Sequence, residues 1–297
     1  MEQALSPAKI NLFLHVTGKR SDGYHELHSL MTCLDFGDRL EFDFTGSGVS
    51  VRCDHPEVPD DDANLVHRAV TLFFDELSKG GGKTKPGVHV VIDKKIPVGA
   101  GLGGGSSNAA TTLLVLNRRF DSPFSLDGLM AMGLRLGADV PFFIHGGPAF
   151  ARGVGEKLSP CGALLPYHVV VFFPGFNVST PLVYKNVDFA LTKQQKSNNN
   201  ALLNKHEMGE MLDIRGLLHN DLEEAACRVY PDIHSVREEM AGFFPEGLLM
   251  SGSGSSFFAL FSDGSRAEQV YDILTEKNMA TDKQVFLTSF AVAGNGL

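Results

Sequence analysis

The sequence predicts an α+β protein built from two domains. The chain has 297 residues, a length that suits two domains better than one. Segments that alternate like strands and segments with helical apolar periodicity follow each other along the chain. The pattern changes beyond residue 150, so we expect one domain over residues 1–155 and a second over residues 156–297. The composition, 43% apolar and 21% charged, is that of an ordinary globular protein.

The first half opens with an alternating segment over residues 8–16, which predicts a strand. One face of this strand carries Ile10, Leu12, Leu14 and Val16. The other face carries Lys9, Asn11, Phe13 and His15. Alternation recurs over 39–45 and 49–53, which together predict a hairpin. The remaining patterns predict a helix over 64–77, a strand over 88–92 and helices over 108–116 and 125–136.

The second half alternates strands with helices, which favours a compact α+β domain. Residues 193–205 are polar, with three consecutive asparagines, and predict a mobile loop. The expected elements are strands over 167–173, 248–250, 257–261 and 285–292, a short helix from Thr180, helices from Asn220 and Pro231, and a helix over 266–277.

A glycine-rich loop joins the strand over 88–92 to the helix that follows it. Glycines let the backbone reach positive φ and approach a ligand closely. The N–H groups of the helix's first turn then point at the ligand, and the helix dipole favours negative charge there. The loop therefore predicts a phosphate cradle, most simply for a nucleotide. It comprises Pro97, Val98, Gly99, Ala100, Gly101, Leu102, Gly103, Gly104, Gly105, Ser106 and Ser107.

The loop by itself does not identify the family, and a loop without a ligand is the plain alternative. Gly105 stands where a P-loop needs its lysine. Gly99, Gly101 and Gly104 match the G-x-G-x-x-G spacing of dinucleotide-binding folds. No second strand ends in an acidic residue at the expected distance, because the residues before Asp121 read as helical.

Several polar side chains are candidates for chemistry near such a loop. Lys9 and Asn11 project side by side from the first strand, although a lone lysine is usually a solvated surface residue. Asp139 lies between apolar segments; it is either a helix N-cap or a base that accepts a hydroxyl proton. Tyr24 and His25 are either surface residues or partners for a flat ring.

The charge and cysteine content limit the partners. A net charge of −9 argues against a nucleic-acid partner, and it means that a phosphorylated ligand needs local donors and Mg²⁺. The four cysteines are scattered, which is typical of reduced thiols in the cytoplasm and gives no zinc site. We expect neither a membrane span nor a targeting segment.

Three segments together resemble one family, the small-molecule kinases of the galactokinase, homoserine kinase, mevalonate kinase and phosphomevalonate kinase (GHMP) superfamily. They are residues 6–12 with 22–27, the loop from Pro97 to Ser107, and the second glycine–serine loop from Ser251 to Ser256. Residues 136–141 and 220–223 agree as well. Within the superfamily, the likeness is greatest to the kinases of a cytidine diphosphate alcohol.

The resemblance implies a ribosomal-protein-like ATP-binding domain, a ferredoxin-like second domain and a site in the cleft between them. It implies that the loop from Pro97 to Ser107 holds ATP with Mg²⁺, that Asp139 is the base and that Lys9 holds the accepting hydroxyl. It assigns the substrate to Asn11, Tyr24, His25 and Tyr184. Tyr184 replaces a frequent phenylalanine, and Ala100 replaces an expected glycine, which requires a negative φ at Ala100.

The implied reaction is ATP-dependent phosphorylation of the 2-hydroxyl of a cytidine diphosphate alcohol, a step of the non-mevalonate route to isoprenoid precursors. The alternatives are another kinase of the superfamily, a dinucleotide-dependent oxidoreductase suggested by the glycine spacing, and an RNA-binding module suggested by the ribosomal-protein-like domain. The acidic balance of the chain weighs against the RNA-binding module.

Overall fold

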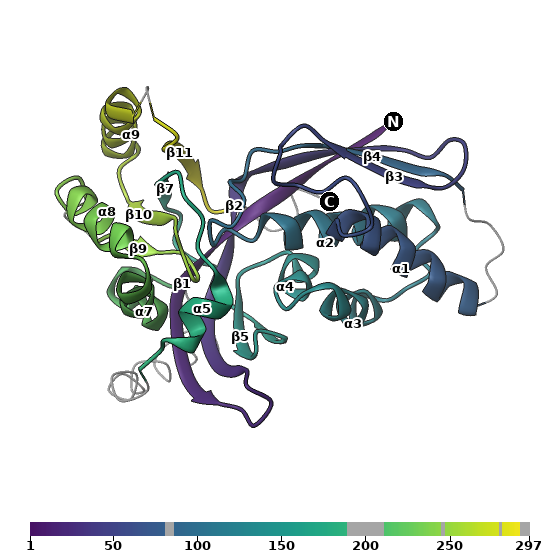
Figure 1. Ribbon diagram of the computed structural model, residues 1–297, viewed down its shortest axis with the longest axis horizontal. Coiled ribbons are helices and arrows are strands. Elements are labelled where there is room, and N and C mark those ends of the chain that lie inside the picture. The colour runs from purple at the N-terminus through teal and green to yellow at the C-terminus, as the bar shows by residue number, and fades with distance from the viewer. Residues whose placement is uncertain (81–85, 189–210, 245–246, 279–280, 292–297) are drawn as a thin grey trace.

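The computed structural model describes residues 1–80, 86–188, 211–244, 247–278 and 281–291. The polar stretch over 193–205, expected to form a mobile loop, lies outside the described residues, and residue 292 of the last expected strand does as well. Figure 1 shows two sheets, each with its own layer of helices, and a long hairpin that runs through the centre of the molecule. Among the described residues, no helix is both long and apolar enough to cross a membrane.

The central hairpin consists of β1 (Glu2–Lys19) and β2 (His25–Asp43), which pair antiparallel along nearly their whole length. The expected strand over 8–16 is therefore confirmed and extended in both directions. A register shift between Asn11 and Phe13 interrupts the alternation. Phe13 consequently packs with Ile10 and not on the side of Lys9, contrary to the sequence expectation. A bulge moves every later side chain to the other face, which local alternation does not reveal.

The expected hairpin of 39–45 with 49–53 is wrong. β4 (Val88–Asp93) pairs antiparallel with β2, and β3 (Val49–Cys53) pairs parallel with β4 on its far side. Gly87 makes this order possible at the turn, where its N–H donates to the Gly46 carbonyl at 3.1 Å. A Cβ on Gly87 would lie 2.4 Å from the Thr45 carbonyl oxygen. The local pattern identifies both strands but not their partners.

Three short strands complete the first sheet. β5 (Ala149–Gly153) pairs with β2, β6 (Lys157–Pro160) pairs with β5, and β8 (His219–Asn220) pairs parallel with β1. The domain division expected at residue 155 stays a prediction; β6, which follows it, and β8 both belong to the sheet of the first half.

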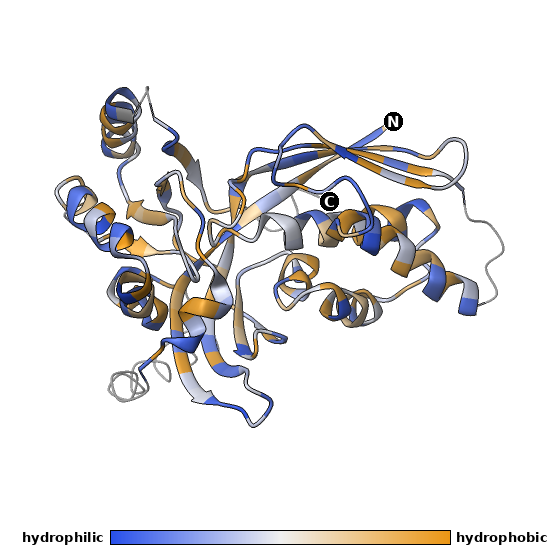
Figure 2. Ribbon diagram, in the orientation of Figure 1, coloured by the Kyte–Doolittle hydropathy of each residue, from blue (hydrophilic) through white to orange (hydrophobic). Residues whose placement is uncertain are grey.

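Four helices of the first half lie on the same side of the first sheet, and two of them pack directly on it (Figure 1). Their apolar faces and the sheet share a buried cluster that includes Phe42, Phe73, Leu113 and Phe142. In Figure 2 the first and third of these helices carry both apolar and polar residues, as the periodicity predicts. They are α1 (Leu65–Lys79), α2 (Gly104–Arg119), α3 (Leu126–Leu136) and α4 (Val140–His145).

The second sheet has the strand order β11-β7-β10-β9, from β7 (His168–Phe173), β9 (Leu249–Met250), β10 (Phe257–Phe261) and β11 (Gln284–Ser289). Numbered along the chain these strands stand in the order 4-1-3-2, and neighbours are antiparallel, as in the expected ferredoxin-like domain. Among the described residues of this half, the helices are α5 (Thr180–Lys185), α7 (Asp221–Val229), α8 (Pro231–Ala241) and α9 (Gly264–Asn278), with a 3-10 turn η2 (Arg215–Leu217).

Candidate active site

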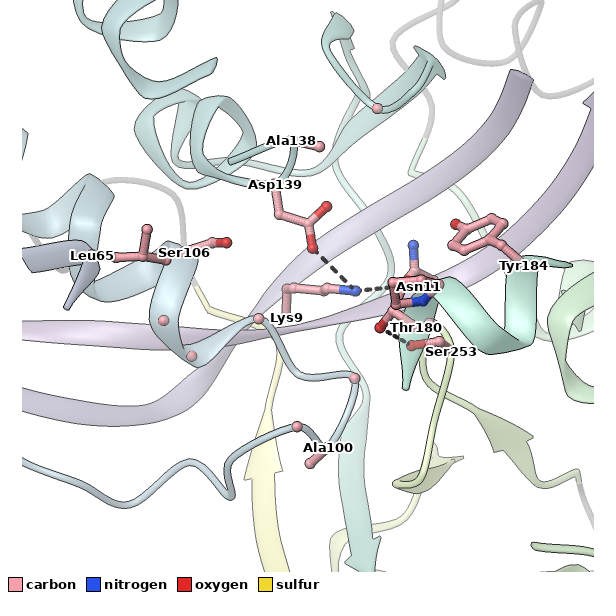
Figure 3. Close-up of a pocket in the computed structure, with 18 of the residues that line it drawn as sticks. Lys9, Asn11, Leu65, Ala100, Ser106, Ala138, Asp139, Thr180, Tyr184 and Ser253 are labelled. Atoms are coloured by element: carbon pink, nitrogen blue, oxygen red, sulfur yellow. Dashed lines mark hydrogen bonds and ion pairs between the residues drawn. The ribbon is translucent and has the colours of Figure 1, made fainter. Parts of the chain in front are cut away.

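A cavity of about 980 Å³ lies between the two halves of the molecule. Its walls come from β1, the first glycine loop, the start of α4, α5 and the second glycine loop, segments that are far apart in the sequence. Figure 3 shows Lys9 and Asp139 in the middle of this cavity, with Ser106 on one side and Tyr184 on the other. The structure thus brings together the loop and the polar residues that the sequence singled out.

The first glycine loop adopts the conformation that its glycines predict. Gly99, Gly101 and Gly103 have φ values of 63°, 77° and 75°, a region that side chains rarely adopt. Gly103 is the N-cap of α2, and Gly104 begins the helix. The first-turn N–H groups of a helix have no acceptor within it, so Gly104, Gly105 and Ser106 present theirs at the cavity wall. This arrangement favours a bound anion.

Ala100 is absent from the described residues with positive φ, which confirms the condition for a methyl group there.

Two residues of the loop, Leu102 and Ser107, do not line the cavity. Leu102 packs in the core, and its carbonyl accepts the Lys9 N–H at 3.0 Å. The Ser107 hydroxyl is buried and accepts a hydrogen bond from the Ser6 hydroxyl at 2.8 Å. These contacts make Leu102 and Ser107 supports of the loop.

Lys9 lies at the centre of the cavity with its ammonium group held on two sides. Its Nζ donates to Asn11 Oδ1 at 2.7 Å and lies 3.8 Å from Asp139 Oδ2. The Asn11 amide donates to Ser29 Oγ at 2.8 Å, and that hydroxyl donates to the Phe13 carbonyl at 2.6 Å. Because this chain of hydrogen bonds fixes the Asn11 oxygen toward Lys9, the ammonium is positioned before any ligand binds.

Asp139 precedes α4, but its side chain makes no capping hydrogen bond. The N-cap role that the sequence left open is therefore not realised. The carboxylate is 38% exposed and points toward Lys9 in Figure 3. Its position beside an ammonium group and next to the helix start that carries Ser106 suits a base that takes a proton from a hydroxyl.

The far end of the cavity carries aromatic rings. The rings of His25 and Tyr184 lie 5.3 Å apart at 31°. Burial, together with the nearby Asp139 carboxylate, raises the pKa of Tyr184, so the phenol remains protonated at neutral pH. Burial and the charge of Lys19 lower the pKa of His25, which favours the neutral imidazole. Tyr24 is 65% exposed and lines the outer edge of the same cavity.

The sequence reasoning missed Lys94, which lines the cavity beside the start of α2. Its Nζ donates to Asp38 Oδ2 at 2.5 Å, and Asp38 Oδ1 accepts the N–H groups of Lys95 and Ile96. Asp38 is fully buried, so it holds both the lysine and the entry of the glycine loop. The available signal was a basic residue directly after the strand that leads into the loop.

A second missed group comes from the segment before α1. The cavity wall includes residues at positions 57–59 and 63–65, of which Asn64 is also the N-cap of α1. Lys19 and Lys185 line the cavity as well. The two lysines add positive charge on a chain whose overall charge is negative, but single lysines at the ends of β1 and α5 gave no signal in the sequence.

The second glycine loop packs directly on the first. The Ser251 hydroxyl donates to the Gly101 carbonyl at 3.1 Å, and the Ser256 N–H donates to the Ala100 carbonyl at 3.2 Å. The Asn220 amide donates to the carbonyls of Met250 and Gly252, each at 2.7 Å. The second loop thus supports the backbone of the first loop at Ala100 and Gly101.

Comparisons with known proteins agree with this fold. Residues 64–147 match the model of the GHMP kinases N terminal domain, and residues 199–280 match the GHMP kinases C terminal model. A solved homoserine kinase from Cytophaga hutchinsonii shares the fold, with a TM-score of 0.71 at 17% identity over 98% of this chain and 95% of that one. The fold is that of a GHMP kinase.

Proteins with higher sequence identity show which family within the GHMP kinases the chain belongs to. The 4-diphosphocytidyl-2-C-methyl-D-erythritol kinase of Syntrophotalea carbinolica is 40% identical over 94% of this chain and 96% of its own length. That of Syntrophus aciditrophicus is 39% identical over 92% and 95%. A crystal structure titled 4-(cytidine 5'-diphospho)-2C-methyl-D-erythritol kinase has a TM-score of 0.78 at 38% identity, covering 98% of this chain and 100% of that one. The chain belongs to the 4-diphosphocytidyl-2-C-methyl-D-erythritol kinase family.

Proposed function

We propose that this protein transfers the γ-phosphoryl group of ATP to the 2-hydroxyl of 4-diphosphocytidyl-2-C-methyl-D-erythritol. The observation that carries the proposal is the pair formed by Lys9 Nζ and Asp139 Oδ2, 3.8 Å apart, inside the cavity that the glycine loop lines. An ammonium, a carboxylate and a helix start in one cavity are the groups that phosphoryl transfer to an alcohol needs.

ATP would lie with its phosphates against the first turn of α2. The N–H groups of Gly104 and Gly105 would then meet the phosphate oxygens, and the segment 57–65 would hold the adenosine side of the cavity. Lys94 adds a cation at the same wall. We propose that Mg²⁺ accompanies ATP, because the Ser106 hydroxyl and the Asp139 carboxylate are oxygen donors of the kind this ion prefers. Mg²⁺ would neutralise charge on the phosphates.

Asp139 would accept the proton of the 2-hydroxyl as that oxygen bonds to the γ-phosphorus and the bond to ADP breaks. Lys9 would stabilise the negative charge on the transferred group, held in place by Asn11. The transition state of phosphoryl transfer asks for positioning and charge stabilisation more than for covalent chemistry. The hydrogen-bonded support of Lys9 meets that requirement because it fixes the ammonium in advance.

The cytidine end of the substrate would occupy the aromatic end of the cavity. Tyr184 and His25 offer ring faces for the base, and Tyr24 closes the outer edge. Lys19 and Lys185 lie where the diphosphate would need positive charge. We further propose a cytoplasmic enzyme, supported by Cys33, Cys53, Cys161 and Cys227 being free thiols.

A substrate panel tests the proposal. ADP release is measured with ATP and the cytidylyl alcohol, against homoserine, mevalonate and galactose as acceptors. We expect the cytidylyl alcohol to be the preferred acceptor, and we expect Asp139→Asn to lower its kcat by about 100-fold or more. Asp127→Asn, an exposed carboxylate of α3, is the matched control and should keep full activity. Preference for another acceptor, or an active Asp139→Asn enzyme, would refute the assignment.

A further inference from the structure

A second cluster of polar side chains lies outside the active-site cavity, where β1, β8 and α7 meet. His15 comes from β1, His219 from β8 and Asp221 from the start of α7. His219 Nε2 lies 2.6 Å from Asp221 Oδ1, and His15 Nδ1 lies 3.9 Å from Asp221 Oδ2. One ligand atom from each of the three residues lies within 4.8 Å of the others.

The fold holds these three side chains in place. β8 pairs parallel with β1, opposite Phe13 and Leu14, so His219 lies beside His15. The two imidazole rings stack with centroids 4.7 Å apart at 21°. Asp221 is 7% exposed, and its Oδ2 accepts the Val16 N–H at 2.7 Å. A backbone hydrogen bond of this kind orients a carboxylate in the way that outer partners orient metal ligands.

The cluster is reached through a groove of about 520 Å³ that His219 and Asp221 line. Glu223 and Glu224 also line it, but Arg237 and Arg228 pair with them at 2.5 and 3.1 Å, so an ion would be held by the three ligands and not by the charge of the groove. His219 is 31% exposed and His15 is 15% exposed, which gives an ion access from one side while the protein surrounds the other.

We propose that His15, His219 and Asp221 bind one divalent transition-metal ion, of which Zn²⁺ is the representative. Two imidazole nitrogens and one carboxylate oxygen form a donor set that suits Zn²⁺ and its neighbours in the series, and not Mg²⁺ or Ca²⁺, which prefer oxygen ligands throughout. The ion takes the place of the hydrogen bond between His219 Nε2 and Asp221 Oδ1, which lie 2.6 Å apart. Water completes its coordination.

The position of the cluster gives the ion a structural consequence. Asn220, between the two ligands His219 and Asp221, holds the carbonyls of Met250 and Gly252. An ion that joins His15 to these neighbours ties β1 to the start of α7 and fixes Asn220. Metal binding therefore stabilises the folded chain, because a ligand that binds only the folded state raises its stability.

The experiment uses the full-length protein after treatment with a chelator and removal of the chelator. Zn²⁺ binding is measured by titration calorimetry, Co²⁺ binding by its visible absorption, and the melting temperature with and without Zn²⁺. We expect one ion per chain and a higher melting temperature with Zn²⁺. His15→Ala and His219→Ala should each weaken binding by at least about 10-fold, since each removes one of three protein ligands.

His234→Ala is the matched control, because His234 lines the same groove but does not belong to the cluster. It should bind Zn²⁺ as the unaltered chain does. If His219→Ala does not fold, His15→Gln provides the same test from the other strand. Absence of stoichiometric binding, equal binding by the His15 variants, or loss of binding in Cys227→Ser while His15→Ala still binds would overturn the proposal. None of these readouts depends on kinase activity.

Discussion

The two glycine–serine loops of this protein look alike in sequence but differ in what their backbones do. Both contain glycines with positive φ, and both lie at the same cavity. The first, over 97–107, leads into α2 and exposes Gly99 and Gly105. The second, over 251–256, leads into β10 and is buried throughout.

The difference follows from what each loop does with its N–H groups. The helix after the first loop leaves its first-turn N–H groups without acceptors in the helix, so they are available to an anion. In the second loop, the Gly254 N–H donates to the Ser251 carbonyl and the Ser256 N–H donates to the Ala100 carbonyl. Glycine density therefore indicates close backbone approach, and the element that follows indicates whether the approach serves a ligand or another segment.

The largest effect should come from breaking the contact between the two loops. A Cβ on Gly101 would lie 2.2 Å from the Ser251 carbonyl oxygen, and φ there is +77°. Gly101→Ala must displace backbone on both sides, so we expect unfolding free energy to fall by about 4 kcal/mol or more. Thermal and urea unfolding measure this change.

Gly46→Ala is the control for Gly101→Ala. Gly46 has a φ of +72°, but its added Cβ would meet only the His89 ring at 3.6 Å. The unfolding free energy of Gly46→Ala should fall by only about 1–2 kcal/mol, the cost of a positive φ for a residue with a Cβ. If the two variants lose the same stability, the two loops do not depend on each other's close approach.

The sequence predicted most of the helices and strands around the two loops, because local signals define them. The helices α1, α3 and α7 are capped near their expected starts, where the side chains of Asn64, Ser125 and Asn220 accept backbone N–H groups. Helix periodicity and capping are local properties of the chain, so sequence patterns report them well.

The rest depends on contacts that local patterns do not contain. The partner of β3 is set by long-range pairing with β4, and the bulge after Asn11 changes which face Phe13 occupies. In the site, Lys9 and Asp139 came from strand position and from resemblance, whereas Lys94 required the buried Asp38 that holds it. Side chains from distant segments meet only through the tertiary fold.

The next largest loss of stability should come from Asn220, the residue that supports the second loop. Asn220→Ala removes two hydrogen bonds to the buried carbonyls of Met250 and Gly252 and the N-cap of α7. Buried carbonyls without a partner are costly, so we expect a loss of about 2–3 kcal/mol in unfolding free energy. Ser125→Ala removes only a cap, that of α3, and should lose about 1 kcal/mol. An equal loss of unfolding free energy in both variants would show that the second loop does not depend on the Asn220 side chain.

A smaller effect should come from Gly252, where the second loop approaches the reacting groups. A Cβ there would lie 3.2 Å from Lys9 Nζ, and φ is +57°. We expect Gly252→Ala to lose about 1–2 kcal/mol of stability from the backbone and to lower kcat about tenfold, because the ammonium must move. Gly48→Ala has a φ of +80° and no atom within 4 Å of its Cβ, so it should lose stability alone. A Gly252→Ala enzyme with unchanged kcat would contradict the placement of Lys9 at the reacting oxygen.

The smallest stability effect, at Gly105, separates the two loops most sharply. Its added Cβ would lie 3.5 Å from Leu65 Cδ1, an ordinary contact, and the residue is helical. Since alanine favours a helix over glycine, Gly105→Ala should leave stability unchanged or raise it by about 0.5 kcal/mol.

Because Gly105 faces the cavity at the first turn of α2, the same methyl group should nevertheless hinder the phosphates and raise the KM for ATP about tenfold. Gly128→Ala, in α3 and away from the cavity, should match its stability change without altering the KM. Steady-state kinetics with varied ATP, beside thermal unfolding, measure both effects. An unaltered KM in Gly105→Ala would mean that the helix start is not where ATP binds. The loop over 97–107 would then not be the ligand-binding loop, and its distinction from the supporting loop over 251–256 would be lost.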